Sequence, residues 1–165
     1  MAHPELHQLF TDELYKMNWF ENALTKTLYN LGRSSDLVNL EISCKKKRAY
    51  SQEHVNRISK IFNTLDEPFQ SVQSKAASGM IADLTAACSQ AKRNDIVCNI
   101  FLILVITKAA NYKLGAYSGI LKLANAMQYH HAEGLLIDTI IEEKQIIAEL
   151  TQLLSDHILA AEITI

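Results

Sequence analysis

Two adjacent glutamates, Glu142 and Glu143, interrupt the apolar stretch Thr139–Ile147, "TIIEEKQII". A buried carboxylate needs a cation, a hydrogen-bond donor or a metal ion beside it, because burying an unpaired charge is costly. Near the start of the chain, Glu21 interrupts an apolar pattern in the same way. Two such carboxylates and a histidine can hold a transition metal, whereas the same carboxylates beside lysines form ion pairs. The chemistry therefore depends on which side chains the fold brings to Glu21 and Glu143.

Helical periodicity places these glutamates. A helix in a bundle shows its core face at spacings of three and four residues. Glu21 is the only charge among positions 10, 14, 17, 21, 24, 28 and 31, and Glu143 is the only charge among positions 136, 140, 143, 147, 150 and 154. We therefore expect Glu143 to point toward the core and Glu142 to lie at the edge of the core.

The two intervening long segments supply polar groups at the same depth. The core stripe of the second segment is polar in its middle, at Lys47, Ser51 and His54. The fourth segment has no carboxylate on its stripe, and Lys113 lies one residue from it. Mid-helix positions of antiparallel helices share one layer. This predicts a buried polar cluster, with the following members: Glu21, Lys47, His54, Lys113 and Glu143.

The whole pattern predicts an all-α fold. Only 5 Gly and 2 Pro interrupt 165 residues, which favours long helices. Gly32 is read as a helix stop, and Asn94 or Asp95 as a helix cap. We expect a single domain over 1–165, a four-helix bundle with an additional short helix in the middle crossover. The helical segments are expected at about 4–31, 34–65, 72–91, 95–128 and 131–160.

Composition narrows the class of protein. A net charge of −2 gives no electrostatic case for nucleic acid. The longest apolar run, 96–106, is too short to span a membrane. The chain shows no signal-peptide pattern, and its cysteines have no CxxC spacing, so we expect a cytoplasmic protein. The apolar end "HILAAEITI" (157–165) favours a homodimer.

Five stretches occur in a distinctive order: "ELYKMNWFENAL" (13–24), "HVNRISKIF" (54–62), "KAASGMI" (75–81), "YKLGAYSGIL" (112–121) and "LLIDTIIEEK" (135–144). In these stretches the chain resembles the YciE/YciF-like ferritin-like stress proteins. This resemblance implies a ferritin-like bundle, a tendency to dimerise, a part in stress response and a di-metal site. At the metal site the chain departs from the family. Tyr50 stands where the family has a carboxylate, four residues before His54. Ala110, Asn111 and Lys113 stand where it has acids and a histidine.

Three arrangements follow from these departures. Glu21, His54 and Glu143 still hold iron or manganese, or they form ion pairs with Lys47 and Lys113, or all of them lie in water at the bundle ends. No Glu or Asp occurs between Ile96 and Ala132, so the fourth helix cannot donate a carboxylate. We therefore favour ion pairs. This predicts a non-catalytic protein that acts through protein contacts, with no catalytic residue, metal ligand or cofactor; its partners other than itself are not predicted.

The remaining histidines are assigned simpler roles. His130 and His131 are expected in a polar loop, exposed to solvent. His3 and His7 are four residues apart in the first helical turns, a spacing that would suit a surface metal. Fraying of the chain end disfavours that site.

Overall fold

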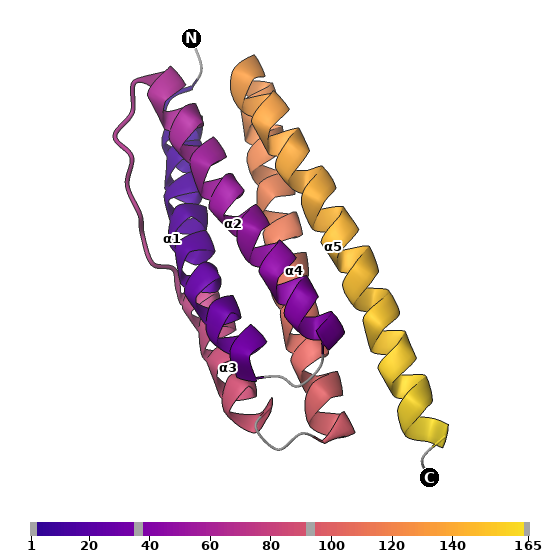
Figure 1. Ribbon diagram of the computed structural model, residues 1–165. Coiled ribbons are helices and arrows are strands. Elements are labelled where there is room, and N and C mark those ends of the chain that lie inside the picture. The colour runs from indigo at the N-terminus through magenta and orange to yellow at the C-terminus, as the bar shows by residue number, and fades with distance from the viewer. Residues whose placement is uncertain (1–2, 35–37, 92–94, 164–165) are drawn as a thin grey trace.

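The computed structural model describes residues 3–34, 38–91 and 95–163, and these form a bundle of helices without strands (Figure 1). The predicted all-α, ferritin-like bundle with a short additional helix is confirmed. The helices are α1 (Pro4–Ser34), α2 (Val38–Leu65), α3 (Lys75–Ala91), α4 (Ile96–Ala126) and α5 (His130–Ile163).

Two helical hairpins make up the bundle. α1 pairs with α2 and α4 pairs with α5, and a long crossover returns along α1 to α3 (Figure 1). The crossover is tied to α1 by two hydrogen bonds. Asn18 Nδ2 donates to the Gln70 carbonyl at 2.7 Å, and the Val72 amide donates to the Tyr15 carbonyl at 3.1 Å. Because the chain returns before α4 begins, α2 and α4 run in the same direction.

Local chemistry sets the helix ends. Asp95 caps α4 by accepting a hydrogen bond from the Val97 amide at 2.7 Å, as the sequence predicted; Asn94 lies outside the described residues. Asp66, directly after α2, and Gln128, which follows the α4 cap residue Met127, adopt left-handed backbone angles with φ of 55° and 59°. Such a residue ends a helix and reverses the chain.

The core agrees with the predicted pattern on α1 and departs from it on α4. All seven predicted α1 positions are buried. On α4, Leu114 and Leu121 are only partly buried, while Lys113, placed just off the stripe, is completely buried. α4 packs against α1, α3 and α5 together, so its buried arc is wider than one stripe. The predicted stop at Gly32 is also wrong, because α1 continues to Ser34.

Length and apolar composition would allow α4 to cross a membrane. Half of its most apolar window is buried inside the bundle. The sequence-based exclusion of a membrane span counted only the uninterrupted run 96–106, whereas the apolar character continues further along this helix.

Candidate functional site

Halfway along the bundle, five ionisable side chains meet in one layer. Each is no more than 1% exposed. Four different helices supply them: Glu21 comes from α1, Lys47 and His54 from α2, Lys113 from α4, and Glu143 from α5. These are the five residues that the sequence analysis grouped together, and the third arrangement, in which they lie in water at the bundle ends, does not occur.

Lys113 lies at the centre of this layer. Its Nζ is 2.5 Å from Glu143 Oε1 and 3.0 Å from Glu21 Oε1. The same nitrogen lies 3.2 Å from His54 Nδ1. Burial would lower the pKa of the lysine, but the two adjacent carboxylates outweigh burial and raise its pKa above the ordinary value. Lys113 is therefore a buried ammonium that bridges two carboxylates.

Lys47 is a second buried ammonium, less well compensated than the first. Its Nζ lies 3.3 Å from Glu143 Oε2, the oxygen that Lys113 does not contact. Burial dominates here and lowers the pKa of Lys47 to about 8, although Glu143 opposes the shift. Glu143 thus has a lysine on each of its two oxygens.

Glu21 is held as a carboxylate by its neighbours. Burial alone would raise its pKa, but the charges of Lys113 and His54 outweigh burial and bring the pKa to about 2. The Tyr117 hydroxyl donates to Glu21 Oε1 at 2.8 Å, and the pKa of Tyr117 is raised well above its ordinary value by burial and by this carboxylate. Glu21 Oε2 and Ser51 Oγ are buried without a hydrogen-bond partner among the described residues.

His54 connects the buried layer to the surface. Its Nδ1 lies 3.0 Å from Glu21 Oε1, and its Nε2 lies 2.8 Å from Glu142 Oε2. Glu142 is 19% exposed and accepts two hydrogen bonds of 2.7 Å from Arg57, a bidentate pair. Burial opposes ionisation of Glu142, but Arg57 and His54 prevail and lower its pKa.

The charges of the layer and its rim balance when His54 is neutral. The carboxylates of Glu21, Glu142 and Glu143 face three cations, from Lys47, Arg57 and Lys113. With its proton on Nε2, neutral His54 donates to Glu142 and accepts from Lys113, and the group has no net charge. A protonated His54 donates to both carboxylates and gives the group one positive charge. The hydrogen bonds among these side chains hold the charged groups and the proton on His54 in fixed positions.

Sequence reasoning missed one important member, Arg57. Arg57 follows His54 by three residues on α2, one helical turn away, and this spacing was the available signal. Tyr50, which replaces an expected carboxylate, lies partly buried with its ring parallel to that of His54 at 6.4 Å between centroids.

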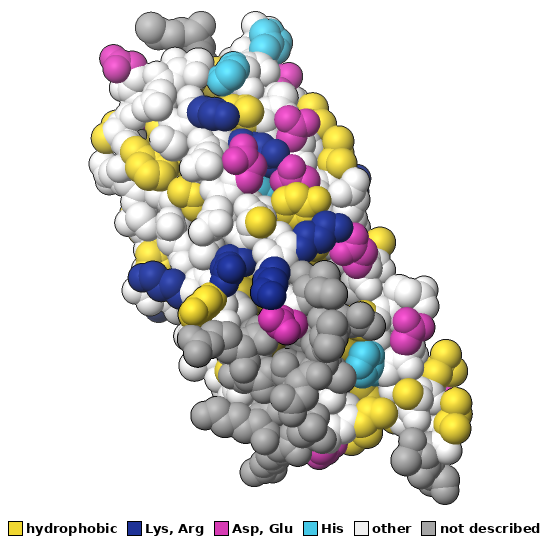
Figure 2. Space-filling model, viewed as in Figure 1, with side chains coloured by type: hydrophobic (Ala, Val, Ile, Leu, Met, Phe, Trp, Pro, Cys, Tyr) yellow, Lys and Arg dark blue, Asp and Glu magenta, His cyan; other side chains and the backbone are white. Residues whose placement is uncertain are grey.

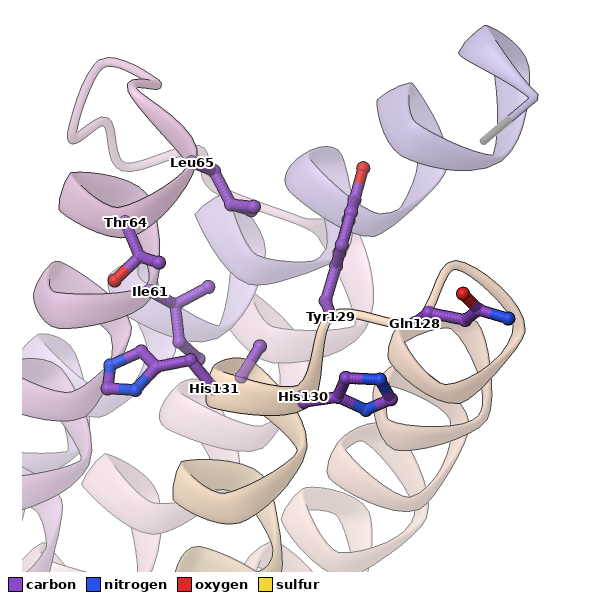
Figure 3. A pocket seen from close by; sticks show the side chains of 8 residues that line it. Ile61, Thr64, Leu65, Gln128, Tyr129, His130 and His131 are labelled. Atoms are coloured by element: carbon purple, nitrogen blue, oxygen red, sulfur yellow. The ribbon is translucent and has the colours of Figure 1, made fainter. Parts of the chain in front are cut away.

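Three of the other histidines, His7, His130 and His131, lie at the end of the bundle where α2 and α4 finish. His7 Nδ1 is 2.7 Å from the Tyr129 hydroxyl, and His7 Nε2 is 2.8 Å from Glu67 Oε1, so His7 fastens the two turns that follow α2 and α4. His130 and His131 are exposed, as expected, but belong to the first turn of α5 and not to a loop. They line a hollow of about 230 Å³ beside the end of α2, where their rings point away from each other (Figure 3).

The side chains in the layer contact one another directly. Among the described residues, no three His, Cys, Asp or Glu side chains are arranged to hold a metal ion. The fold and this layer together define a ferritin-like helical bundle with a charged interior.

The chain belongs to the DUF892 family, described as a domain of unknown function, whose model matches residues 5–162. The E. coli stress protein YciF has a similar structure: the TM-score is 0.88 and the identity 22%, over 94% of this chain and 98% of that one. YcfI of Rhodopseudomonas palustris, for which a structural role has been suggested, matches with a TM-score of 0.78 and 16% identity, over 88% and 92% of the two chains. At these identities the likeness shows the fold. No curated protein sequence matches the chain.

Proposed function

We propose that this protein is a non-catalytic ferritin-like bundle in which buried ion pairs take the place of a di-metal centre. It acts through contacts with other proteins, in a stress response. One observation carries the proposal: the ammonium of Lys113 lies between the two carboxylates that would otherwise ligate metal, 3.0 Å from Glu21 and 2.5 Å from Glu143.

The donor set does not fit a di-metal centre. Such a centre in this fold uses carboxylates and histidines from all four long helices. Here α4 contributes Lys113 and Tyr117 to the layer, and its residues from Ile96 to Ala126 contain no Glu or Asp. A cation placed between Glu21 and Glu143 would meet two lysine ammonium groups. The lysines already neutralise these carboxylates, so the site has no charge left for metal to compensate.

The likeness to YciF and YcfI supports the rest of the proposal. YciF is described as a stress protein, and a structural role has been suggested for YcfI. Neither description names an enzymatic activity. A bundle whose central layer is filled by its own ion pairs is well suited to such a role, because the layer specifies the packing of the helices while the outer faces make the contacts.

Elemental analysis tests the proposal directly. The protein is purified without chelator from cells grown with added iron, manganese and zinc. We expect less than about 0.1 metal ion per chain, because ligands paired with ammonium groups bind metal poorly. Stoichiometric metal that is lost in both Glu21→Gln and Glu143→Gln would overturn the proposal. The control is Glu149→Gln, because Glu149 is a surface carboxylate on the same helix as Glu143.

Such a result would favour the second candidate function, a redox protein that binds iron or manganese through Glu21, His54 and Glu143. One observation favours it: Glu21 Oε2 is buried and has no hydrogen-bond partner in the described part of the chain, a costly state for a carboxylate oxygen. His54 Nδ1 also lies within 3.8 Å of an oxygen of each carboxylate. Binding there would require both lysines to leave the layer.

We also propose that the protein forms a homodimer through the C-terminal part of α5. Ile158, Leu159 and Ile163 are 42%, 57% and 86% exposed, and together they form an apolar face; Ile165 lies outside the described residues. Light scattering at micromolar concentration should give twice the chain mass. Leu159→Lys should give a monomer, whereas Gln145→Lys, an exposed position nearer the middle of α5, should not. A monomeric wild-type chain would contradict the proposal.

A further inference from the structure

A polar groove follows the outer seam between α1 and α2. It consists of two adjoining hollows of about 600 and 480 Å³, which share Thr25, Lys26 and Gln52. These volumes are in the range of small-molecule sites, about 300–1,000 Å³. Asn22, Tyr29 and Asn30 of α1, and Arg48, Val55 and Asn56 of α2, complete the walls of the groove.

The groove carries two cations that lack a carboxylate partner. In the basic run 45–48, Lys45, Lys46 and Lys47 are paired with Glu41, Glu149 and Glu143 respectively. Arg48 forms no ion pair within the described part of the chain, and neither does Lys26 on the opposite wall. No described Asp or Glu lines either hollow. Basic side chains gather at mid-height of the face over α1 and α2 (Figure 2). In a chain with a net charge of −2, this is a local excess of positive charge.

The side chains around these cations could bind the neutral, hydroxyl-rich part of a ligand. Arg48 is held with its guanidinium 5.0 Å from the centroid of the Tyr29 ring, which limits its motion. Asn22 donates its amide protons to Asn18 and leaves its own oxygen free to accept. Gln52 makes no hydrogen bond to any described residue and offers both a donor and an acceptor.

We propose that this groove binds a small sugar phosphate, with the phosphate between Lys26 and Arg48 and the sugar hydroxyls on the amides. A phosphate monoester carries between one and two negative charges at neutral pH and matches two cations on opposite walls. A planar guanidinium forms paired hydrogen bonds with phosphate oxygens, and a lysine adds a point charge. The site is independent of the buried layer and of the proposed dimer face.

Ribose 5-phosphate is the probe. Amide chemical-shift titrations of the full chain should show a Kd of about 1 mM, as expected for an open and polar groove. The shifted resonances should belong to residues 22–30 and 48–56. Ribose, inorganic phosphate and glucuronate, titrated separately, should each bind at least about ten-fold more weakly, because each lacks one part of the recognised ligand.

Variants locate the site. Arg48→Ala should raise the Kd about ten-fold and Lys26→Ala about five-fold, because each removes a charged hydrogen-bond donor. Lys60→Ala is the matched control: it removes from α2 one exposed cation that has no ion pair among the described residues, 12 residues or about 18 Å from Arg48. The control should leave the Kd unchanged. Three results would overturn the proposal: the absence of chemical-shift changes at about 10 mM probe, chemical-shift changes confined to residues outside the groove, or a Kd raised as much by Lys60→Ala as by Arg48→Ala. Inorganic phosphate or glucuronate binding as tightly as the probe overturns the sugar phosphate assignment.

Discussion

Replacing Lys113 with Met should destabilise the protein severely, although the two side chains have similar lengths. The pKa of Glu21 falls from its ordinary 4.5 to about 2, with Lys113 the largest favourable influence. At 1.36 kcal/mol per pKa unit, this gap corresponds to about 3 kcal/mol at neutral pH. Lys113 also contacts Glu143 at 2.5 Å, so its removal leaves two incompletely compensated carboxylates in the core. We expect a loss of about 3–5 kcal/mol, as for other broken buried ion pairs.

Urea denaturation at pH 7 measures this loss, followed by circular dichroism and by the fluorescence of Trp19, the only tryptophan. Lys122→Met provides the control, because Lys122 is exposed on the same helix; it should change the free energy of unfolding by less than about 0.5 kcal/mol. A loss below about 1 kcal/mol for Lys113→Met would refute the account, because an uncompensated buried carboxylate should destabilise the fold by more than that.

A balanced replacement distinguishes charge from packing, even if Lys113→Met fails to fold. Glu143 serves Lys47 as well as Lys113, so Lys47 must be replaced with the others to leave no orphaned cation. The variant with Met at all four positions, Glu21, Lys47, Lys113 and Glu143, should be more stable than Lys113→Met alone. Buried ion pairs replaced by apolar residues of similar volume often cost little. A quadruple variant less stable than Lys113→Met would mean that packing, and not charge balance, governs the layer.

Four further predictions concern the neighbouring groups. Glu21→Gln should flatten the fall in unfolding free energy between pH 4.5 and about 2, because the depressed pKa gives stability that is present above 4.5 and lost on acidification; an unchanged slope would contradict this. Between pH 8 and 10.5 Lys47 is protonated in the unfolded chain but not in the folded chain. The free energy of unfolding of the wild type should therefore rise relative to that of Lys47→Met as the pH increases through this range. A difference between the two proteins that does not change with pH would contradict this prediction. Arg57→Met should cost only about 1–2 kcal/mol in urea denaturation, since Arg57 and Glu142 are partly exposed; a cost as large as that of Lys113→Met would place Arg57 within the core network. His7→Phe should accelerate amide exchange about ten-fold in the turn that precedes α5 and leave the middle of α4 unchanged, and a uniform acceleration would show that His7 does not act locally.

The sequence predicted the helices, the membership of the layer and the pairing of its carboxylates with lysines, but not which oxygen each lysine contacts. The α1 stripe was correct at all seven positions, although α1 also buries residues outside the stripe, among them Tyr15 and Phe20. On α4 the predicted stripe failed, because Leu114 and Leu121 on the stripe are only partly buried, whereas Lys113 beside it is completely buried. Which lysine reaches which oxygen of Glu143 depends on the axial register of α2, α4 and α5, to within a fraction of a helical turn. Sequence periodicity cannot supply that register. Arg57 was also missed because its partner Glu142 lies on another helix, so the pairing depends on the same register between helices.

The state of the Lys113 amine tests the central claim most directly. In protein labelled with ¹⁵N at lysine side chains, NMR at neutral pH reports the charge and the hydrogen exchange of each Nζ. We predict a charged, slowly exchanging signal that disappears in Lys113→Met and does not shift when iron(II), manganese(II) or zinc is added. A Lys113 signal that exchanges as fast as that of the exposed Lys122 would show that no buried ammonium bridges Glu21 and Glu143. A signal displaced by stoichiometric metal would show that the carboxylates still form a metal centre.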